Sequence, residues 1–229
     1  MTEHLDGFRG VLQVDGYAGY KELARADRSA GVIMLAYCLA HARREFFDVH
    51  KQTGDPIAAE ALRRIGEIYA IEARIRGRTA QERVIVRQAE TKPLIAELWS
   101  WLMERLGEIS AKSSLATALR YTLGHWEGLT LFLSDGRIEV DNNTAERCIR
   151  PIPLGRKNAL FAGSRSGGER WAVLASLINT CKLHEIDPET YLADVLERIV
   201  SGRTKVNALR ELLPWNWKTA RSAPIAAAA

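Results

Sequence analysis

The sequence predicts an α/β protein that is mostly helical, and three observations support this fold class. Residues 11–15 and 31–39 are short apolar segments with the length and side-chain types of strands. Residues 41–133 place apolar side chains every three or four positions, which is the spacing of amphipathic helices. Two further segments after residue 140, beginning at residues 141–144 and 187–188, carry helix-start signals. Together they predict a piece of an α/β sheet joined to helices, in a chain of 229 residues that can bury a sizeable core.

The first forty residues are predicted to hold the strands. Residues 11–15, Val-Leu-Gln-Val-Asp, form a short strand that ends at an acid, and Gly16 breaks it. Residues 19–28 then predict a short helix. Residues 31–39 are almost continuously apolar, which predicts a buried strand, with a helix beginning near Ala40. We predict a first domain at residues 1–40.

Residues 41–140 are predicted to be a helical insertion that follows the second strand. Helices are expected at residues 41–50, 57–76, 79–109 and 113–132. Pro93 predicts a break inside the third of them. Ser113 and Ser114 are residue types that cap the start of a helix.

The remaining chain is predicted to contain a capped helix, a loop and a helical region. Residues 141–144, Asp-Asn-Asn-Thr, precede a helix that Pro151 and Pro153 end. Residues 154–168 have the composition of a loop, and residues 169–184 that of a helix. Asp187 and Pro188 start another helix, which reaches about residue 200. Residues 212–217 form an aromatic-proline segment. Two further domains are predicted, at residues 141–163 and 164–229.

Positive charge is concentrated in one segment. Lys and Arg total 32 against 28 for Asp and Glu. Residues 147–170 contain one acid, Glu169, and six basic residues: Arg147, Arg150, Arg156, Lys157, Arg165 and Arg170. Such a glycine-rich basic segment suits contacts with phosphates, and the alternative is a solvated loop without a ligand. It lacks the Gly-Lys-Ser/Thr ending of a nucleotide-binding P-loop.

Composition argues against several other classes of protein. The three cysteines share no short spacing, so a disulfide framework is not expected. Cys38 and His41 have ligand-like spacing, but no second pair completes a zinc site. Residues 1–10 are charged, and residues 31–40 have about half the length of a membrane span, so we expect a cytoplasmic protein without a signal peptide or membrane partner.

Asp15 is the first candidate site residue. It follows a predicted strand, and open α/β sheets place their chemistry beyond the carboxyl ends of strands. The alternative is an ordinary turn, because Asp-Gly is a common turn pair.

Glu146 is the second candidate. Asn142 and Asn143 precede it by four and three positions and Arg150 follows by four, so all four share one face of a helix. This face could hold a metal and a phosphate together. The alternative is helix capping, with Glu146 paired to Arg150. His41, near Arg43 and Arg44, is a further candidate for a phosphate contact, or else a structural residue.

At these residues the chain resembles the transposases of the insertion sequence 66 family. The resemblance lies in four stretches in the family's order: residues 12–20 (Leu-Gln-Val-Asp-Gly-Tyr-Ala-Gly-Tyr), 40–46 (Ala-His-Ala-Arg-Arg, then Phe46), 141–164 (Asp-Asn-Asn, Glu-Arg, Ile-Arg-Pro, Gly-Arg-Lys-Asn and Phe-Ala-Gly-Ser) and 212–215 (Leu-Leu-Pro-Trp).

The resemblance implies a ribonuclease-H-like core with three catalytic acids, Asp, Asp and Glu, that hold Mg²⁺ or Mn²⁺. Asp15 matches the second Asp and Glu146 the Glu, both as catalytic residues and metal ligands. Asn142, Asn143, His41 and Arg44 would support the site. The six basic residues of segment 147–170 would contact the DNA of transposon ends and target. A homo-oligomer or a full-length transposase is the expected protein partner.

One departure from the family pattern shapes the expected activity. The first Asp should lie on a strand well upstream of Asp15, and the preceding acids, Glu3 and Asp6, are too close to it. We therefore expect a partial ribonuclease-H-like core, truncated at its N-terminus, and DNA cleavage and strand transfer that are weak or absent. The alternative is a non-catalytic fragment that binds DNA or a transposase.

Overall fold

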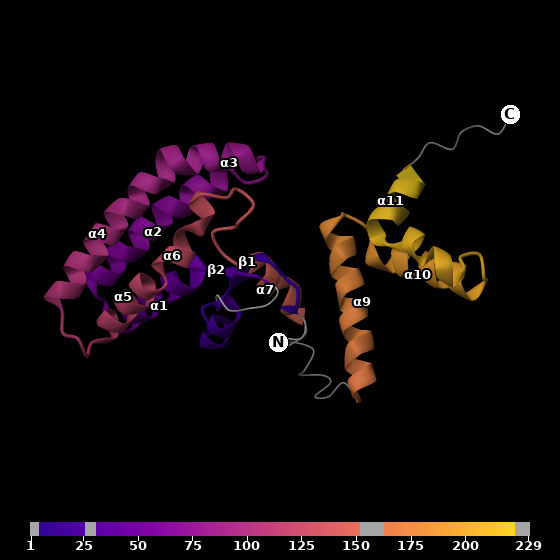
Figure 1. Ribbon diagram of the computed structural model, residues 1–229, viewed down its shortest axis with the longest axis horizontal. Coiled ribbons are helices and arrows are strands. Elements are labelled where there is room, and N and C mark those ends of the chain that lie inside the picture. The colour runs from indigo at the N-terminus through magenta and orange to yellow at the C-terminus, as the bar shows by residue number, and fades with distance from the viewer. Residues whose placement is uncertain (1–4, 26–30, 152–162, 223–229) are drawn as a thin grey trace. The chain divides into compact units, whose positions relative to one another are not determined.

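The computed structural model describes residues 5–25, 31–151 and 163–222. They form two compact units, residues 1–146 and residues 147–229 (Figure 1). Each unit has a hydrophobic core of its own. The narrower domain boundaries predicted from the sequence stay predictions.

The first unit is a two-stranded sheet followed by helices. It begins with strand β1 (Gly10–Val14), the 3₁₀ helix η2 (Ala18–Ala24) and strand β2 (Ile33–Tyr37). The helices that follow are α1 (Leu39–Thr53), α2 (Pro56–Arg74), α3 (Ala80–Val86), the π turn η3 (Arg87–Thr91), α4 (Lys92–Glu108), α5 (Ser114–Gly124), α6 (Trp126–Thr130) and the 3₁₀ helix η4 (Leu131–Leu133). Helix α7 (Asn143–Ile149) crosses the boundary between the units.

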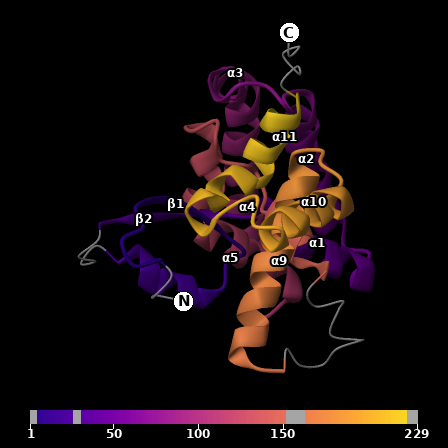
Figure 2. The ribbon, with the colours of Figure 1, turned by 90° about the vertical axis from the view of Figure 1, so that its right-hand side faces the viewer.

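The two strands are parallel, and both faces of the pair are packed. Their register runs from Gly10 opposite Ile33 to Val14 opposite Tyr37, and Figure 2 shows the strands side by side. Side chains alternate between faces along a strand. One face therefore contributes Val14, Ile33 and Leu35 to a small core with Leu23 of η2, while Ala36 on the other face joins the main helical core. This confirms the predicted buried strand and the α/β, mostly helical class.

Helices α1, α2, α4 and α5 pack together around the main core of the first unit (Figure 1). Phe46, Ile65, Leu102 and Leu119 are completely buried there, each from a different one of these four helices. They are the apolar positions that recur at helical spacing in the sequence. Helix α6 approaches β2 so closely that a Cβ at Gly128 would clash with the Tyr37 ring and the Leu35 carbonyl.

Several predicted helices differ from those in the structure. The segment at 19–28 is the shorter 3₁₀ helix η2, and the one predicted at 113–132 divides at His125. The break predicted at Pro93 is wrong, because the chain stays helical from Ala80 to Glu108. The π turn η3 comes directly before Pro93, and a wider turn accommodates a ring that would clash in a regular helix.

The second unit consists of helices. These are α9 (Arg165–Leu183), α10 (Pro188–Val200), the 3₁₀ helix η5 (Val206–Leu212) and α11 (Pro214–Ser222). Cys181, Ile186, Tyr191 and Trp217 form its buried core, and the Tyr191 hydroxyl donates a 2.7 Å hydrogen bond to the Leu212 carbonyl. Helix α9 begins four residues before the predicted start at residue 169, because the Ser164 hydroxyl caps it by accepting from the Gly167 N–H. Among the residues described, no helix is both long enough and apolar enough to cross a membrane.

Candidate active site

Asp15 directly follows β1, at the carboxyl end of the two-stranded sheet. Its side-chain Oδ1 accepts a 2.9 Å hydrogen bond from the Tyr17 N–H, and its carbonyl accepts a 3.2 Å bond from the Tyr121 hydroxyl. Gly16 has φ +93°, and a Cβ there would clash with the Tyr121 hydroxyl. A glycine is therefore needed where α5 meets this turn. The turn fixes the orientation of the carboxylate at the end of the strand.

The segment at residues 139–142 is attached to the same end of the sheet. The Gln13 side chain of β1 donates a 2.8 Å hydrogen bond to the Glu139 carbonyl. The Leu39 N–H, at the start of α1, donates a 3.0 Å bond to the Val140 carbonyl. The Asn142 N–H lies 3.4 Å from the sulfur of Cys38, the residue after β2 has ended. These contacts place the start of α7 beside the carboxyl ends of the strands.

Glu146 on α7 contacts His41 in the first turn of α1. The His41 Nε2 and Glu146 Oε1 atoms are 3.5 Å apart, and the two side chains are 29% and 45% exposed. The fold thus brings the predicted site residues His41 and Glu146 together. The neighbouring contact between Cys38 and Asn142 joins residues 104 positions apart in the chain. In the part of the chain that the structure describes, no ion pair joins Glu146 to Arg150, so the pairing expected from helix spacing is not made.

Two buried polar atoms, one on His41 and one on Asn142, lack a hydrogen-bond partner among the described residues. They are Nδ1 of His41 and the side-chain Oδ1 of Asn142. An unpaired buried acceptor is costly, and such atoms often mark a position where a ligand, ion or water belongs. Both predicted supporting residues therefore offer free binding capacity at the candidate site.

Burial and negative charge shape the titration of the neighbouring groups. Burial, with the charges of Glu45, Cys38 and Asp15, raises the pKa of Tyr121 to about 12. Burial also raises the pKa of the Cys38 thiol, which hydrogen bonds from backbone N–H groups oppose only partly. At neutral pH the Tyr121 hydroxyl is therefore a donor that holds the Asp15 carbonyl, and Cys38 is a neutral thiol.

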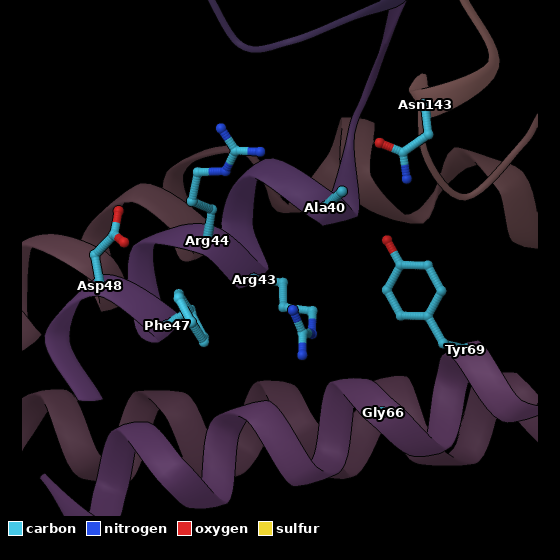
Figure 3. A pocket seen from close by; sticks show the side chains of 8 residues that line it. All are labelled: Ala40, Arg43, Arg44, Phe47, Asp48, Gly66, Tyr69 and Asn143. Atoms are coloured by element: carbon cyan, nitrogen blue, oxygen red, sulfur yellow. The ribbon is translucent and has the colours of Figure 1, made fainter. Parts of the chain in front are cut away.

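A pocket of about 900 Å³ is lined by residues that are close to His41 and Glu146 in the chain, among them Ala40 and Asn143. The side chains that line it come from α1, α2 and the start of α7 (Figure 3), and they are Ala40, Arg43, Arg44, Phe47, Asp48, Gly66, Tyr69 and Asn143. Arg44 and Asn143, both predicted as supporting residues, therefore share one cavity. Arg43 and Tyr69 join them.

Four of the six predicted DNA-binding residues lie within the part of the chain that the structure describes. Arg147, Arg150, Arg165 and Arg170 are exposed, and Arg147 and Arg150 lie at the end of α7. Arg165 and Arg170 lie in the first two turns of α9, where Arg165 pairs with Glu169 at 3.2 Å. Arg156 and Lys157 lie outside the described residues. These arginines therefore offer charge on the second unit, and their role in binding DNA stays a prediction.

The candidate site holds oxygen donors of the kind that Mg²⁺ and Mn²⁺ prefer, but few of them. Asp15 and Glu146 supply carboxylates, and Asn142 an unpartnered carbonyl oxygen. Across residues 5–25, 31–151 and 163–222, no three His, Cys, Asp or Glu side chains are grouped so that they could hold a metal ion. The donor chemistry fits a divalent cation, whereas the number of ligands within the described residues does not complete a site.

Comparison with known proteins gives the family. Residues 1–170 match the family described as "Transposase IS66 family", and residues 176–215 match the "IS66 C-terminal element". The chain belongs to the IS66 transposase family. The resemblance seen in the sequence is thereby confirmed, and the second match falls within the helical second unit.

Relatives of this IS66 transposase chain occur in Sinorhizobium fredii (strain NBRC 101917 / NGR234). The chain is 52% identical over 216 residues to the protein named "Uncharacterized protein y4jD", and the match covers 93% of the chain and 42% of that relative. It is 44% identical over 239 residues to "Uncharacterized protein y4hP", covering 99% of the chain and 43% of that relative. The chain thus spans about two fifths of the length of these curated relatives. No solved structure matches it.

Three residues at the candidate site were not among the site residues predicted from the sequence. Tyr121 holds the Asp15 carbonyl from 106 positions away, Tyr69 enters the pocket from α2, and Cys38 accepts the Asn142 N–H. Tyr69 and Tyr121 appear in the sequence as apolar positions of amphipathic helices, and Cys38 as a small buried residue. Only Cys38 has a local signal, its spacing from His41, and the contacts of all three residues join segments that are distant in the chain.

Proposed function

We propose that this chain is part of a transposase that cuts and joins DNA by phosphoryl transfer, at a site that contains Asp15 and Glu146. One observation supports this most strongly. Helix α7 starts beside the carboxyl end of β2, through the Asn142–Cys38 contact, and Asp15 follows the parallel neighbour β1. Both acids therefore belong to the same end of the sheet. Such an arrangement agrees with a partial ribonuclease-H-like core in which residues 41–140 are an insertion.

The chain's own residues have distinct tasks in this proposal. Asp15, oriented by the Tyr17 N–H, is the ligand at the end of a strand, and Glu146 approaches from the helix. His41, 3.5 Å away, orients the Glu146 carboxylate. Mg²⁺ or Mn²⁺ held by these acids would activate water or a DNA 3′-hydroxyl and stabilise the leaving oxygen. The exposed arginines neutralise DNA phosphates without reading sequence.

The family resemblance implies three acids, and Asp15 and Glu146 are two of them. The chain spans about two fifths of the length of its relatives. We propose that the third carboxylate corresponds to a residue in the part of the relatives that this chain does not cover. The 229-residue chain alone is then expected to bind divalent metal weakly and to cleave DNA poorly or not at all.

Metal binding by single variants tests the site directly. Asp15→Asn and Glu146→Gln should each weaken Mn²⁺ binding roughly tenfold or more, because even the outer partners of metal ligands contribute about 10–100-fold. Titration calorimetry on the whole chain measures this. Glu211→Gln is the matched control, since Glu211 is exposed on η5 of the second unit. Equal Mn²⁺ affinity in all four proteins would refute the proposed site.

Cleavage of terminal-repeat DNA with Mn²⁺ separates the remaining alternatives. Robust cleavage that Glu146→Gln abolishes would support the site and refute the expected inactivity. A second candidate function is a non-catalytic DNA-binding fragment, which the exposed Arg150, Arg165 and Arg170 favour. DNA binding that is salt-dependent, needs no metal and is unchanged in Asp15→Asn, without any cleavage, would favour this second function.

A further inference from the structure

The pocket between α1, α2 and the start of α7 has features of a nucleotide site. We propose that it holds an unpaired nucleotide of the DNA strand, with the phosphate on Arg43 and Arg44 and the base against Phe47. This inference rests on the proposed function, because it supplies a position for the strand beside the candidate active site. Both arginines line this pocket of about 900 Å³, and Figure 3 shows Arg43 and Phe47 extending toward α2 and Tyr69, with Arg44 extending from the other side of α1.

The charge of the pocket favours an anion. Arg43 and Arg44 are both exposed, and neither forms an ion pair with any residue that the structure describes. Asp48 is the only carboxylate among the described lining residues, and it does not come within 4.0 Å of either guanidinium as an ion pair. By contrast, Arg63 on α2 pairs with both Glu60 and Glu67. Two unpaired guanidinium groups at one cavity are well suited to a phosphate.

Neutral polar groups in the pocket can complete the phosphate site. The Tyr69 hydroxyl is buried and makes no well-formed hydrogen bond with the residues that the structure describes, although the Asp141 carboxylate lies nearby. Burial, together with the charge of Asp141, raises the pKa of Tyr69, so the hydroxyl remains a donor at neutral pH. Asn143 lies across from Tyr69 in Figure 3 and brings amide donors from α7. A phosphate or sugar oxygen could accept hydrogen bonds from the Tyr69 hydroxyl and the Asn143 amide.

Phe47 indicates that the ligand has an aromatic part as well as a charge. Its side chain is 44% exposed and lines the pocket next to the arginines on α1. An exposed aromatic ring beside arginines is the pattern that stacks bases of single-stranded nucleic acid. The faces of a paired base are covered by its neighbours in the duplex. A ring in this position therefore selects an unpaired base, as at a strand end or beside a melted cleavage point.

The position of the pocket identifies the ligand as part of the DNA strand. Asn143 precedes Glu146 by three residues on α7, so both share a face of that helix. His41, which contacts Glu146, lies between the pocket residues Ala40 and Arg43 on α1. A strand whose reacting phosphate lies at Glu146 thus brings its adjacent nucleotide to the pocket, whereas an acidic peptide has no such continuity with the site.

Fluorescence anisotropy with the whole chain tests this inference. The probes are a labelled duplex with a short single-stranded tail and the same duplex with blunt ends, both without metal. Arg43→Ala/Arg44→Ala and, separately, Phe47→Ala should weaken binding of the tailed probe roughly tenfold or more. Phe47→Ala should leave the blunt duplex within about twofold of the unaltered chain. Arg76→Ala/Arg78→Ala is the matched control, because it removes equal charge from exposed arginines that follow the end of α2.

Each outcome bears on the inference separately from the proposed function. If the pocket variants bind the tailed probe as tightly as the Arg76/Arg78 control, the pocket is not a nucleotide site, whatever the metal titration shows. If inorganic phosphate competes as well as a nucleoside monophosphate, the role of Phe47 is overturned. Loss of tailed-probe binding in the pocket variants, together with normal Mn²⁺ affinity in Asp15→Asn, would support the pocket and refute the metal site.

Discussion

Arg87 is a buried side chain that donates several hydrogen bonds to other described residues. It is 0% exposed, and its guanidinium donates to both carboxylate oxygens of Glu72, at 2.8 and 2.7 Å. It also donates to the carbonyls of Phe132 and Ile138, at 2.8 and 3.0 Å. A single residue thereby ties the π turn to α2 and to the segment that runs on toward α7.

Replacement of Arg87 tests this role. Arg87→Met should lower the free energy of unfolding by about 3–5 kcal/mol, because Glu72 is left as a buried charge with only the more distant Arg83, at 3.7 Å, as a partner. Guanidinium denaturation monitored by circular dichroism measures the change. Arg63→Met, on the exposed side of α2, is the control and should have a much smaller effect. Arg87→Met/Glu72→Leu should recover part of the loss, and equal stability of the Arg87 and Arg63 variants would contradict this account.

At the scale of single elements, side-chain caps decide where several helices begin. The Asp55 carboxylate accepts from the Ile57 and Ala58 N–H groups at 2.8 and 3.0 Å, with Pro56 at the first position of α2. Thr79 and Glu82 form a reciprocal capping box at the start of α3. Asp, Thr and Pro are residue types favoured at helix starts, although the apolar spacing rather than the caps predicts these two helices. Helix starts are therefore local, and the sequence predicts them well.

The α2 cap provides a measurable case. Asp55→Ala should destabilise the chain by about 1 kcal/mol, because two N–H groups of the first turn lose their acceptor. Asp55→Asn keeps an acceptor oxygen and should lie close to the unaltered chain. The midpoint of urea denaturation distinguishes the three proteins. If Asp55→Asn were as unstable as Asp55→Ala, the hydrogen bonds would not be the source of the stability.

Predictions failed for elements that depend on partners elsewhere in the chain. The helix predicted at 113–132 divides at His125, whose ring lies 4.5 Å from the rings of both Tyr37 and Tyr121. The His125 Nδ1 atom is 2.7 Å from the Tyr121 carbonyl. Tyr37 belongs to β2, so a tertiary contact holds the backbone where the apolar spacing predicts a continuous helix. Propensity and periodicity do not contain that information.

At the scale of the whole molecule, the chain has two separately packed units. The core of the first unit joins helices α1, α2, α4 and α5 with one face of the sheet. The core of the second is much smaller and depends on Tyr191 and Trp217, whose rings are 5.5 Å apart at 83°. Units with separate cores are expected to unfold in separate transitions.

Calorimetry of two core variants tests this independence. Leu102→Ala should lower the free energy of unfolding of the first unit alone, by about 2–5 kcal/mol, because Leu102 is completely buried in that core. Tyr191→Phe should lower the free energy of unfolding of the second unit alone, by about 1 kcal/mol, because the hydrogen bond to the Leu212 carbonyl is lost. A single transition that both substitutions shift would show that the units unfold as one.

The sequence by itself determined the class of the fold, the buried second strand, most helix starts and the family. All of these depend on patterns within a few residues, such as apolar period, cap residues and motif order. It also marked Asp15 and Glu146, whose joint role remains a prediction. Only the tertiary structure placed Glu146 against His41, attached residues 139–142 to the ends of the strands, and added Arg43 and Tyr69 to a pocket with Asn143. Contacts between segments about a hundred residues apart are decided by how the helices pack, which no local pattern encodes.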